Sequence, residues 1–265
     1  MIPKKIHYCW FGRNPKSDDI LYYIESWKKH CSDYEFIEWN EDNFDINSNM
    51  YVKEAYDAKK WAFITDYVRL WVIFTYGGIY MDTDVEVLKP LDSFLKHPAF
   101  SGFESNSTIT TGIMAGEKDN KWFKIQLSYY DNKHFLLEDG TYDLTTNVKT
   151  ITNLTKQNYS INLDNSFQDL GDIVFYSSEY FCPKDNQTGL LHITENSHTI
   201  HHFNGSWATK NHKNFANTRR FLKRKFGKKI GSVLLVIPFI YWQIKDNGIK
   251  KTIQKFIHRV CLFFK

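Results

Sequence analysis

Apolar and polar positions along the first forty residues predict a β-α-β unit. An apolar run over residues 6–11 closes at Gly12 and predicts a first strand. Over residues 19–30, apolar residues recur at helical spacing, which predicts an amphipathic helix. Polarity then alternates over residues 34–39, as it does in a half-buried strand. This order of elements is typical of an α/β domain.

A second and longer helix is predicted over residues 59–76. Ile64 and Val72 lie on its apolar side, and the pair Gly77-Gly78 ends it. A third strand follows over residues 79–83. The rest of the pattern predicts, in chain order, strands over 100–104 and 109–115, helices over 120–130 and 145–158, and strands over 173–176 and 199–203.

The composition is that of a folded protein. The chain has 265 residues, of which 42% are hydrophobic and 17% aromatic, enough for one domain of ordinary size with a sizeable core. No internal repeat or low-complexity linker occurs before about residue 210. We therefore expect one α/β domain over residues 1–210 and a separate segment over residues 211–265.

Charge divides the chain near the same place. Residues 219–265 contain 13 Lys or Arg and one acid, Asp246, whereas the rest of the chain holds 21 basic and 29 acidic residues. The apolar run over residues 232–244 contains Pro238 and is shorter than the roughly 20 residues of a membrane span. Basic residues interleaved with Phe, Leu and Trp predict an amphipathic segment on an anionic membrane surface. A helical subdomain packed on the core and a nucleic-acid-binding surface are the alternatives.

Cysteine usage and the first residues bear on the compartment. The four cysteines are scattered without the spacing of a metal site, which favours reduced thiols. Residues 1–12 contain no apolar stretch long enough for a signal peptide. We expect a cytoplasmic protein, peripheral on the inner face of the plasma membrane.

Two acidic residues follow the third predicted strand. Asp82 and Asp84 stand at i and i+2 and project to one side, with Tyr80 in the same register. Mg²⁺ and Mn²⁺ combine few protein carboxylates with phosphate oxygens, so such a pair suits either ion. The ion would neutralise charge on a departing diphosphate. Taken alone, an Asp-x-Asp pair is also typical of an ordinary acidic turn.

The preceding helix carries a charged pair. Asp66 and Arg69 are three residues apart and share a face opposite the apolar side. The arginine could bind a phosphate or sugar oxygen through charge-assisted hydrogen bonds. The alternative is an exposed intrahelical ion pair, which contributes on the order of a few tenths of a kcal/mol.

A histidine pair lies in the late run IHHFNGSW over residues 200–207. A neutral imidazole would complete the coordination of an ion such as Mn²⁺, and Asn204 and Ser206 offer further oxygens. Neighbouring residues of a strand point to opposite sides, so only one of His201 and His202 can face the site. We expect that one to be His202, and the alternative is a structural histidine beside the core.

Taken together, these segments resemble glycosyltransferase family 32. The run from Lys59 to Val87 is similar to the DXD-containing segment of that family, and IPKKIHYCWFG to its first strand. YSSEYFCP and IHHFNGSW resemble the bacterial capsule members in particular. The resemblance covers residues 2–210, with the motifs in the family's order. It implies a GT-A fold, which is a Rossmann-like mixed sheet flanked by helices.

The resemblance also implies an activity. It is the transfer, with retained anomeric configuration, of a hexose from a nucleoside-diphosphate sugar held through Mn²⁺ or Mg²⁺. The analogy favours a UDP-hexose, although GDP-mannose remains open. The implied acceptor is a lipid-linked glycan of capsule, exopolysaccharide or lipopolysaccharide synthesis.

Matching positions give the implied roles of the first part of the site. Trp10 would lie beside the nucleotide base. Asp66 and Arg69 would hold sugar hydroxyls and phosphate. Asp82 would contact ribose and metal, and Asp84 would bind the metal directly. Asp82, Asp84 and Arg69 form the implied catalytic group.

The remaining implied roles fall near residue 200 and on the third strand. His202 and Gly205 fit an H-x-x-G pattern that resembles a third metal ligand of related enzymes. Ser206 and Trp207 would belong to a loop closing over the diphosphate. Tyr80 and Asn204 are further candidates for contact with the donor.

The residues leave the chemical route and two rival functions open. Retention could proceed by front-face attack, with the leaving phosphate taking the acceptor's proton, or through a glycosyl intermediate on Glu104. The motif Asp82-Thr83-Asp84-Val85 also matches haloacid-dehalogenase-type phosphohydrolases, in which it lies on the first strand. A sugar-nucleotide-binding module without turnover is the second rival.

Overall fold

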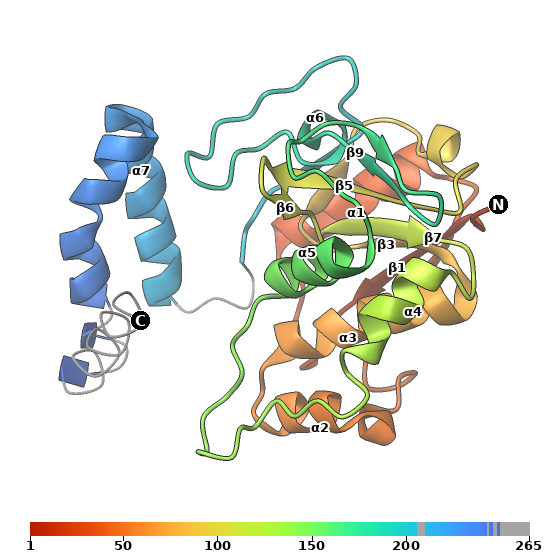
Figure 1. The fold of residues 1–265 in the computed structure, drawn as a ribbon, viewed down its shortest axis with the longest axis horizontal. Helices are drawn as coiled ribbons and strands as arrows, with labels where there is room; N and C mark the ends of the chain where they lie inside the picture. The colour runs from red at the N-terminus through yellow and green to blue at the C-terminus, as the bar shows by residue number, and fades with distance from the viewer. Residues whose placement is uncertain (206–209, 243, 246–247, 250–265) are drawn as a thin grey trace. The chain divides into compact units, whose positions relative to one another are not determined.

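Two units make up the part of the chain that the computed structural model describes, residues 1–205, 210–242, 244–245 and 248–249 (Figure 1). The first unit comprises Met1–Lys184 and His192–Phe203, and the second comprises Asp185–Leu191 and the described residues from Asn204 onward. The strands are β1 (Lys5–Cys9), β2 (Glu35–Trp39), β3 (Gly78–Met81), β4 (Val85–Val87), β5 (Ala99–Ser105), β6 (Thr108–Ile109), β7 (Ile113–Gly116), β8 (Gln168–Asp169), β9 (Val174–Tyr176) and β10 (Thr199–His201).

The helices lie between and after these strands along the chain. They are α1 (Asp18–His30), α2 (Met50–Asp57), α3 (Trp61–Tyr76), α4 (Lys121–Ser128), α5 (Asn147–Asn158), α6 (Ser178–Phe181) and α7 (Lys210–Leu234), with 3-10 turns η1 (Ile46–Ser48) and η2 (Asp92–Phe94).

A mixed sheet forms the centre of the first unit. Its strand order is β2-β1-β3-β7-β5-β9-β8, with β6 paired to β5. The pairs β1–β2, β1–β3 and β5–β9 are parallel, whereas β7 runs antiparallel to both β3 and β5. The predicted α/β class, a mixed central sheet flanked by helices, is confirmed.

Hydrophobic cores lie on both faces of this sheet. Tyr80 of β3 faces a core with residues of α3 and α4, whereas its neighbours Ile79 and Met81 face a second core with α1 and η2. Successive side chains of a strand point to opposite faces, so each buried strand supplies both cores. The fully buried strands β3 and β7 are therefore apolar throughout rather than alternating.

A two-stranded sheet and helix α1 hold the segment after β3. β4 pairs antiparallel with β10, and the register sets His201 opposite Val85. From α1, the buried Trp27 donates its indole N–H to the Val85 carbonyl at 2.6 Å. The Ser26 hydroxyl accepts the Val87 N–H at 2.9 Å. These bonds attach the Asp82–Asp84 turn to both the helix and the late strand.

Most predicted elements are present, with three differences. The strand expected over residues 109–115 is broken into β6 and β7, because residues 110–112 leave the sheet. The sequence pattern did not predict α2, the short strands β4 and β8, or the one-turn helix α6. α3 begins at Trp61 and is buried on more than one side, so Asp66 and Arg69 are buried as well.

The second unit contains a helical hairpin. α7 is interrupted at Gly227, where φ is +77°, and residues 236–242 continue as helix. Phe215 packs on Phe239 with ring centroids 5.8 Å apart. A Cβ on Gly231 would lie 2.7 Å from the Cα of Lys223, so the two arms approach closely there. Within the described residues, no helix combines the length and the apolar character needed to cross a membrane.

Replacing Trp27 with Phe should destabilise the first unit. The substitution leaves the buried Val85 carbonyl without its donor, and an unpaired buried polar group costs about 1–3 kcal/mol. We expect urea unfolding to show a loss of that size. Tyr22→Phe is the matched control, because Tyr22 is 61% exposed and its bond to Glu86 lies at the surface. That variant should stay within about 0.5 kcal/mol of the wild type. Equal losses in both variants would contradict this account.

Candidate active site

Three potential metal ligands converge at the carboxyl end of β3. Asp82, Asp84 and His201 each offer one ligand atom, and these atoms lie within 4.8 Å of one another. The residues 82–84 form a turn between β3 and β4, in which the Val85 N–H donates to the Asp82 carbonyl at 3.0 Å. The two aspartates therefore come together through a tight turn rather than through the alternation of a continuous strand.

This ligand set fits a borderline or hard divalent cation. Two carboxylates and one imidazole are donors that Mn²⁺ accepts, and Mg²⁺ takes the carboxylates with additional oxygens. All three residues are partly buried, so a bound ion would keep open positions for oxygens of a ligand. The predicted Asp-x-Asp site is thus geometrically suited to one ion.

The structure places His201, rather than His202, beside the two aspartates. The His201 Nε2 lies 3.2 Å from Asp84 Oδ1. His202 points the other way, where its Nε2 is 2.8 Å from Glu86 Oε2 and its ring stacks on Tyr23 at 4.5 Å. The choice between the two histidines depended on the side to which the late strand turns. That side is set by the pairing of β10 with β4.

At each of the two histidines, burial lowers the pKa and a neighbouring carboxylate raises it, but the net shift differs. Burial disfavours the His201 imidazolium, but Asp84 outweighs this effect and raises the His201 pKa well above its usual value. For His202, burial prevails over the neighbouring Glu86 and lowers the pKa. A cation at the site would have to displace the proton of His201, so its binding should strengthen as pH rises.

Arg69 is a buried charge that holds Asp82 in place. Its Nη1 donates to the Thr111 carbonyl at 2.6 Å and lies 3.2 Å from Asp82 Oδ1. Its Nε donates to the Thr65 carbonyl, and Nη2 lies 3.4 Å from Asp66. Only 5% of Arg69 is exposed, so the alternative of a solvated surface pair is wrong. These bonds orient Asp82, whereas direct contact of Arg69 with a donor stays a prediction.

Asp66 and Tyr80 complete this buried cluster. Burial raises the Asp66 pKa to about 7 against the opposing pull of Arg69. The Tyr80 hydroxyl donates to Asp82 Oδ1 at 2.8 Å, and the guanidinium of Arg69 lies over the Tyr80 ring, 4.9 Å from its centroid. Asp82 therefore contacts both an arginine of α3 and a tyrosine of β3, the strand that it follows.

Loop 110–112 supports the cluster from β7. The Asp82 N–H donates to the Gly112 carbonyl at 2.8 Å. A Cβ on Gly112 would lie 2.7 Å from His201 Nδ1, so only glycine lets the imidazole approach. The sequence pattern alone did not indicate Gly112 as a packing residue of the site. Its position next to Thr110-Thr111 at a strand end was the available signal.

The remaining predicted site residues lie in other segments or outside the described residues. Trp10 follows β1, where its indole donates to the Asn14 carbonyl at 2.6 Å. Glu104 is half-buried at the end of β5, with burial raising its pKa and with Thr108 as a hydrogen-bond partner. Asn204 is described as part of the second unit. Ser206 and Trp207 lie outside the described residues.

Residues 17–101 match the family model of the glycosyltransferase sugar-binding region containing a DXD motif. The match includes Asp66, Arg69, Asp82 and Asp84, so the coarser part of the resemblance is confirmed. His201 lies beyond the matched segment, and its place in the site rests on the geometry alone.

Two fungal proteins are among the relatives. Inositol phosphoceramide mannosyltransferase 3 of Schizosaccharomyces pombe is 31% identical over 128 residues, which cover 44% of this chain and 34% of that protein. Mannosyl phosphorylinositol ceramide synthase SUR1 of Saccharomyces cerevisiae is 25% identical over 154 residues, covering 51% and 37%. The matched region thus spans about a third of each relative's length. Neither name refers to capsule synthesis, so that part of the resemblance is not confirmed.

Solved structures give a weaker likeness. A glycosyltransferase involved in the glycosylation of the major capsid of PBCV-1 is 15% identical, covers 77% of this chain and 95% of its own, and has a TM-score of 0.44. That score is too low to establish a common fold by itself.

Replacing His201 should weaken metal binding, whereas replacing His202 should not. We expect His201→Ala to raise the Kd for Mn²⁺ at least about tenfold, since one of three ligands is lost. His202→Ala is the matched control, because its ring faces Glu86 and Tyr23. Mn²⁺ titration followed by electron paramagnetic resonance measures both. Wild-type affinity should also rise from pH 6 to pH 8. A larger effect from His202→Ala would restore the original choice.

Proposed function

We propose that the protein is a GT-A-type, metal-dependent, retaining glycosyltransferase that moves a hexose from a nucleoside-diphosphate sugar to an acceptor glycan. The convergence of Asp82, Asp84 and His201 beside the buried Arg69 carries this proposal. The match of residues 17–101 to a DXD-containing sugar-binding region supports it. The fungal relatives named above add mannose as a candidate hexose, while the family analogy favours a UDP-hexose.

The chain's own residues would do the positioning. Asp82, Asp84 and His201 would hold Mn²⁺ or Mg²⁺, which supplies positive charge to the departing diphosphate. Arg69 and Tyr80 keep Asp82 oriented before any ligand arrives, so little reorganisation is needed on binding. In front-face transfer, the acceptor hydroxyl forms the new glycosidic bond as the bond to phosphate breaks, and the leaving phosphate oxygen takes the hydroxyl's proton.

The phosphohydrolase rival fits the observed geometry less well. The motif follows the third strand along the chain, not the first. Phosphohydrolases of that type also carry a late pair of aspartates, whereas the late Asp172 of this chain follows Gly171 and accepts the Tyr159 hydroxyl at 2.9 Å. The second rival, a binding module without turnover, would bind the donor but release no nucleoside diphosphate from it.

Donor turnover should depend on the metal and on Asp84. With Mn²⁺, we expect the purified chain to release nucleoside diphosphate slowly from one member of a panel of UDP- and GDP-sugars. With EDTA, we expect no release from any member of the panel. Asp84→Asn should reduce the rate about a hundredfold or more. Asp57→Asn is the control, because that carboxylate only pairs with Lys53 at the surface. Binding calorimetry on the same panel completes the test. Binding without release would favour the module, and neither binding nor release would refute the proposal.

We further propose that the second unit binds an anionic membrane surface, so that the protein acts on a lipid-linked acceptor at the inner face of the plasma membrane. In this proposal the acceptor is an intermediate of capsule or lipopolysaccharide synthesis. Along the second arm of the hairpin, Ile230, Val233 and Ile237 recur at helical spacing and are 60%, 71% and 79% exposed. Along the sequence, Lys225, Lys228 and Lys229 precede this stripe and Lys245 follows it. An exposed apolar stripe with flanking cations is typical of an interfacial helix.

Vesicle binding should require both charge and the apolar stripe. We expect the full chain to co-sediment with vesicles containing phosphatidylglycerol but not with pure phosphatidylcholine, and to dissociate at high salt. The pair Val233→Asn and Ile237→Asn should lower the bound fraction about fivefold or more. The matched control is Leu144→Asn with Phe167→Asn, which removes two apolar residues of the first unit that are 61% and 56% exposed. Unchanged binding by the hairpin variant would refute the proposed surface.

A further inference from the structure

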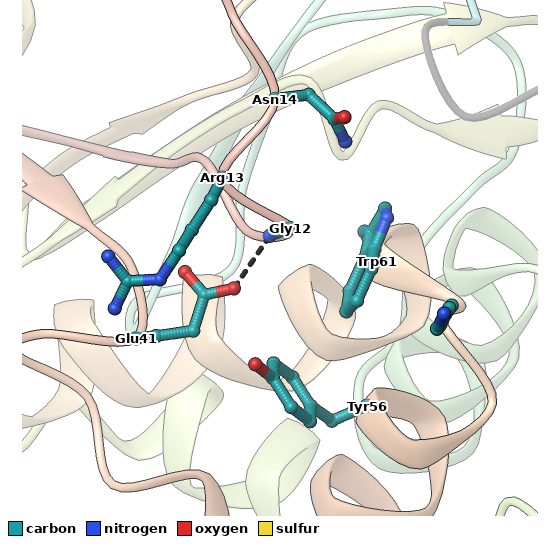
Figure 2. Close-up of a pocket in the computed structure, with 7 residues that line it drawn as sticks. Gly12, Arg13, Asn14, Glu41, Tyr56 and Trp61 are labelled. Atoms are coloured by element: carbon teal, nitrogen blue, oxygen red, sulfur yellow. Dashed lines mark hydrogen bonds between the residues drawn. The ribbon is translucent and has the colours of Figure 1, made fainter.

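A cavity of about 430 Å³ lies at the carboxyl ends of β1 and β2 and belongs with the metal site. Figure 2 shows the Glu41 carboxylate beside it, where Oε1 accepts the Gly12 N–H at 2.7 Å. Trp61, another lining residue, is the first residue of α3, the helix whose Arg69 holds Asp82. Helix α3 therefore connects the cavity with the metal ligands. The lining residues are Gly12, Arg13, Asn14, Glu41, Tyr56, Lys59 and Trp61.

The second unit carries a separate group of cations on α7. Arg219 and Lys223 are four residues apart, as are Arg220 and Arg224, so these side chains share one side of the first arm. Lys228 comes one residue after the interruption of the helix. These residues form the cationic face of the second unit. They bring basic side chains together although like charges repel one another.

The loop over residues 185–191 belongs to the same unit and orients the arginines. Arg219 Nη2 donates to the Asn186 carbonyl at 3.2 Å and to the Asn186 amide oxygen at 3.0 Å. Arg224 donates to the Thr188 carbonyl from Nε at 3.2 Å and from Nη2 at 2.9 Å. Carbonyl and amide oxygens carry no net charge, so these bonds fix the guanidinium groups without neutralising them.

Little negative charge opposes the cationic face. Lys223 donates to the neutral side chain of Gln187 at 2.7 Å, and Lys228 pairs with Asp185 at 2.6 Å. Among the described residues of the second unit, Asp185 is the only acidic residue. Burial and the neighbouring cations lower the pKa of Lys223 against the pull of Asp185. A bound anion would relieve the repulsion between these cations.

The cationic face is both preorganised and accessible. Gly189 has a φ of +70°, and a Cβ there would lie 3.1 Å from Arg224 Nη2 and 3.2 Å from Arg220 Cδ. The loop backbone thus lies directly against both arginines. Arg224 is exposed to solvent, as is 60% of the Lys228 side chain. A ligand can therefore reach cations whose positions are already fixed, which lowers the entropy cost of binding.

Neighbouring phosphate groups suit this arrangement. Guanidinium groups bind phosphate oxygens through paired N–H donors, and a diphosphate can contact several cations at once. On the same arm, Phe221 and Phe226 are 60% and 41% exposed. Exposed apolar side chains beside cations offer contact to the hydrocarbon part of a lipid. A diphosphate attached to a hydrocarbon chain fits both features.

We propose that the cationic face and the loop over residues 185–191 bind the diphosphate group of a lipid-linked acceptor. The inference rests on the proposed function and deepens it, because it assigns a site to the lipid anchor of the acceptor rather than to its glycan. General attraction to an anionic surface depends on surface charge and not on the kind of headgroup. This site, in contrast, distinguishes a diphosphate from separate phosphate groups of equal total charge.

The test is co-sedimentation of the full chain with phosphatidylcholine vesicles that contain either solanesyl diphosphate or phosphatidylglycerol, matched in zeta potential. EDTA is present throughout, so that no divalent cation binds diphosphate at the metal ligands. We expect at least about fivefold tighter binding to the diphosphate vesicles. Arg220→Gln with Arg224→Gln should abolish this preference. The matched control is Lys225→Gln with Lys229→Gln, which removes the same charge from outside the cationic face and should weaken both bindings while keeping their ratio.

A second variant keeps the charge and changes only the donor geometry. Arg224→Lys retains a cation but loses the paired N–H donors of the guanidinium group. We expect it to reduce the preference for diphosphate at least about twofold while leaving binding to phosphatidylglycerol unchanged. Circular dichroism in the far ultraviolet, matching that of the wild type, excludes loss of the helices as the cause. If the double arginine variant does not fold, Arg224→Lys decides the question.

The other outcomes separate this inference from the proposed function. If the wild type binds neither kind of vesicle, the proposed membrane surface fails together with this inference, whereas nucleoside diphosphate release still tests the transferase activity. If it binds both kinds equally, only the inference fails. If the lysine control also loses the preference, or if Arg224→Lys keeps it in full, general charge accounts for the binding and the inference is overturned.

Discussion

The buried guanidinium of Arg69 is the interaction on which the site depends. It joins α3 to the Asp82 carboxylate and to the Thr111 carbonyl, and thus ties together three segments distant in sequence. A charge removed from water is costly unless ion pairs and hydrogen bonds compensate it. Asp82 supplies part of that compensation, together with Asp66 and the carbonyl of Thr111. In the same position it lies within 4.8 Å of ligand atoms of Asp84 and His201, so the ion pair that stabilises the buried charge also orients the metal ligand.

The short strands β4 and β10 add the third ligand to this pair. β4 is anchored to α1 by Trp27, and β10 is registered on β4 so that His201 lies opposite Val85. The imidazole can approach because position 112 has no side chain. Residues from the middle and the late part of the first unit thus meet through backbone pairing. A metal ion would find its ligands arranged in advance.

The relation between the cavity and the metal ligands also comes from the scaffold. β1 and β3 are parallel neighbours, so the loops that follow them open at the same edge of the sheet. α3 runs from Trp61 at one site to Arg69 at the other. A rigid helix therefore fixes the separation between the cavity and the metal ligands.

Local patterns were enough for most of the fold and for the residue types at the site. Apolar periodicity indicated β1, α1, β2, α3 and β3, because strands and helices bury residues at different spacings. The Asp-x-Asp spacing and the late histidine pair indicated a cation site. Only the tertiary structure decided that His201 faces the aspartates, because the facing side depends on strand pairing. It also decided that Asp66 and Arg69 are buried, since α3 packs on more than one side, and that Glu41 lines a cavity. Each of these depends on contacts between distant segments, which no local pattern encodes.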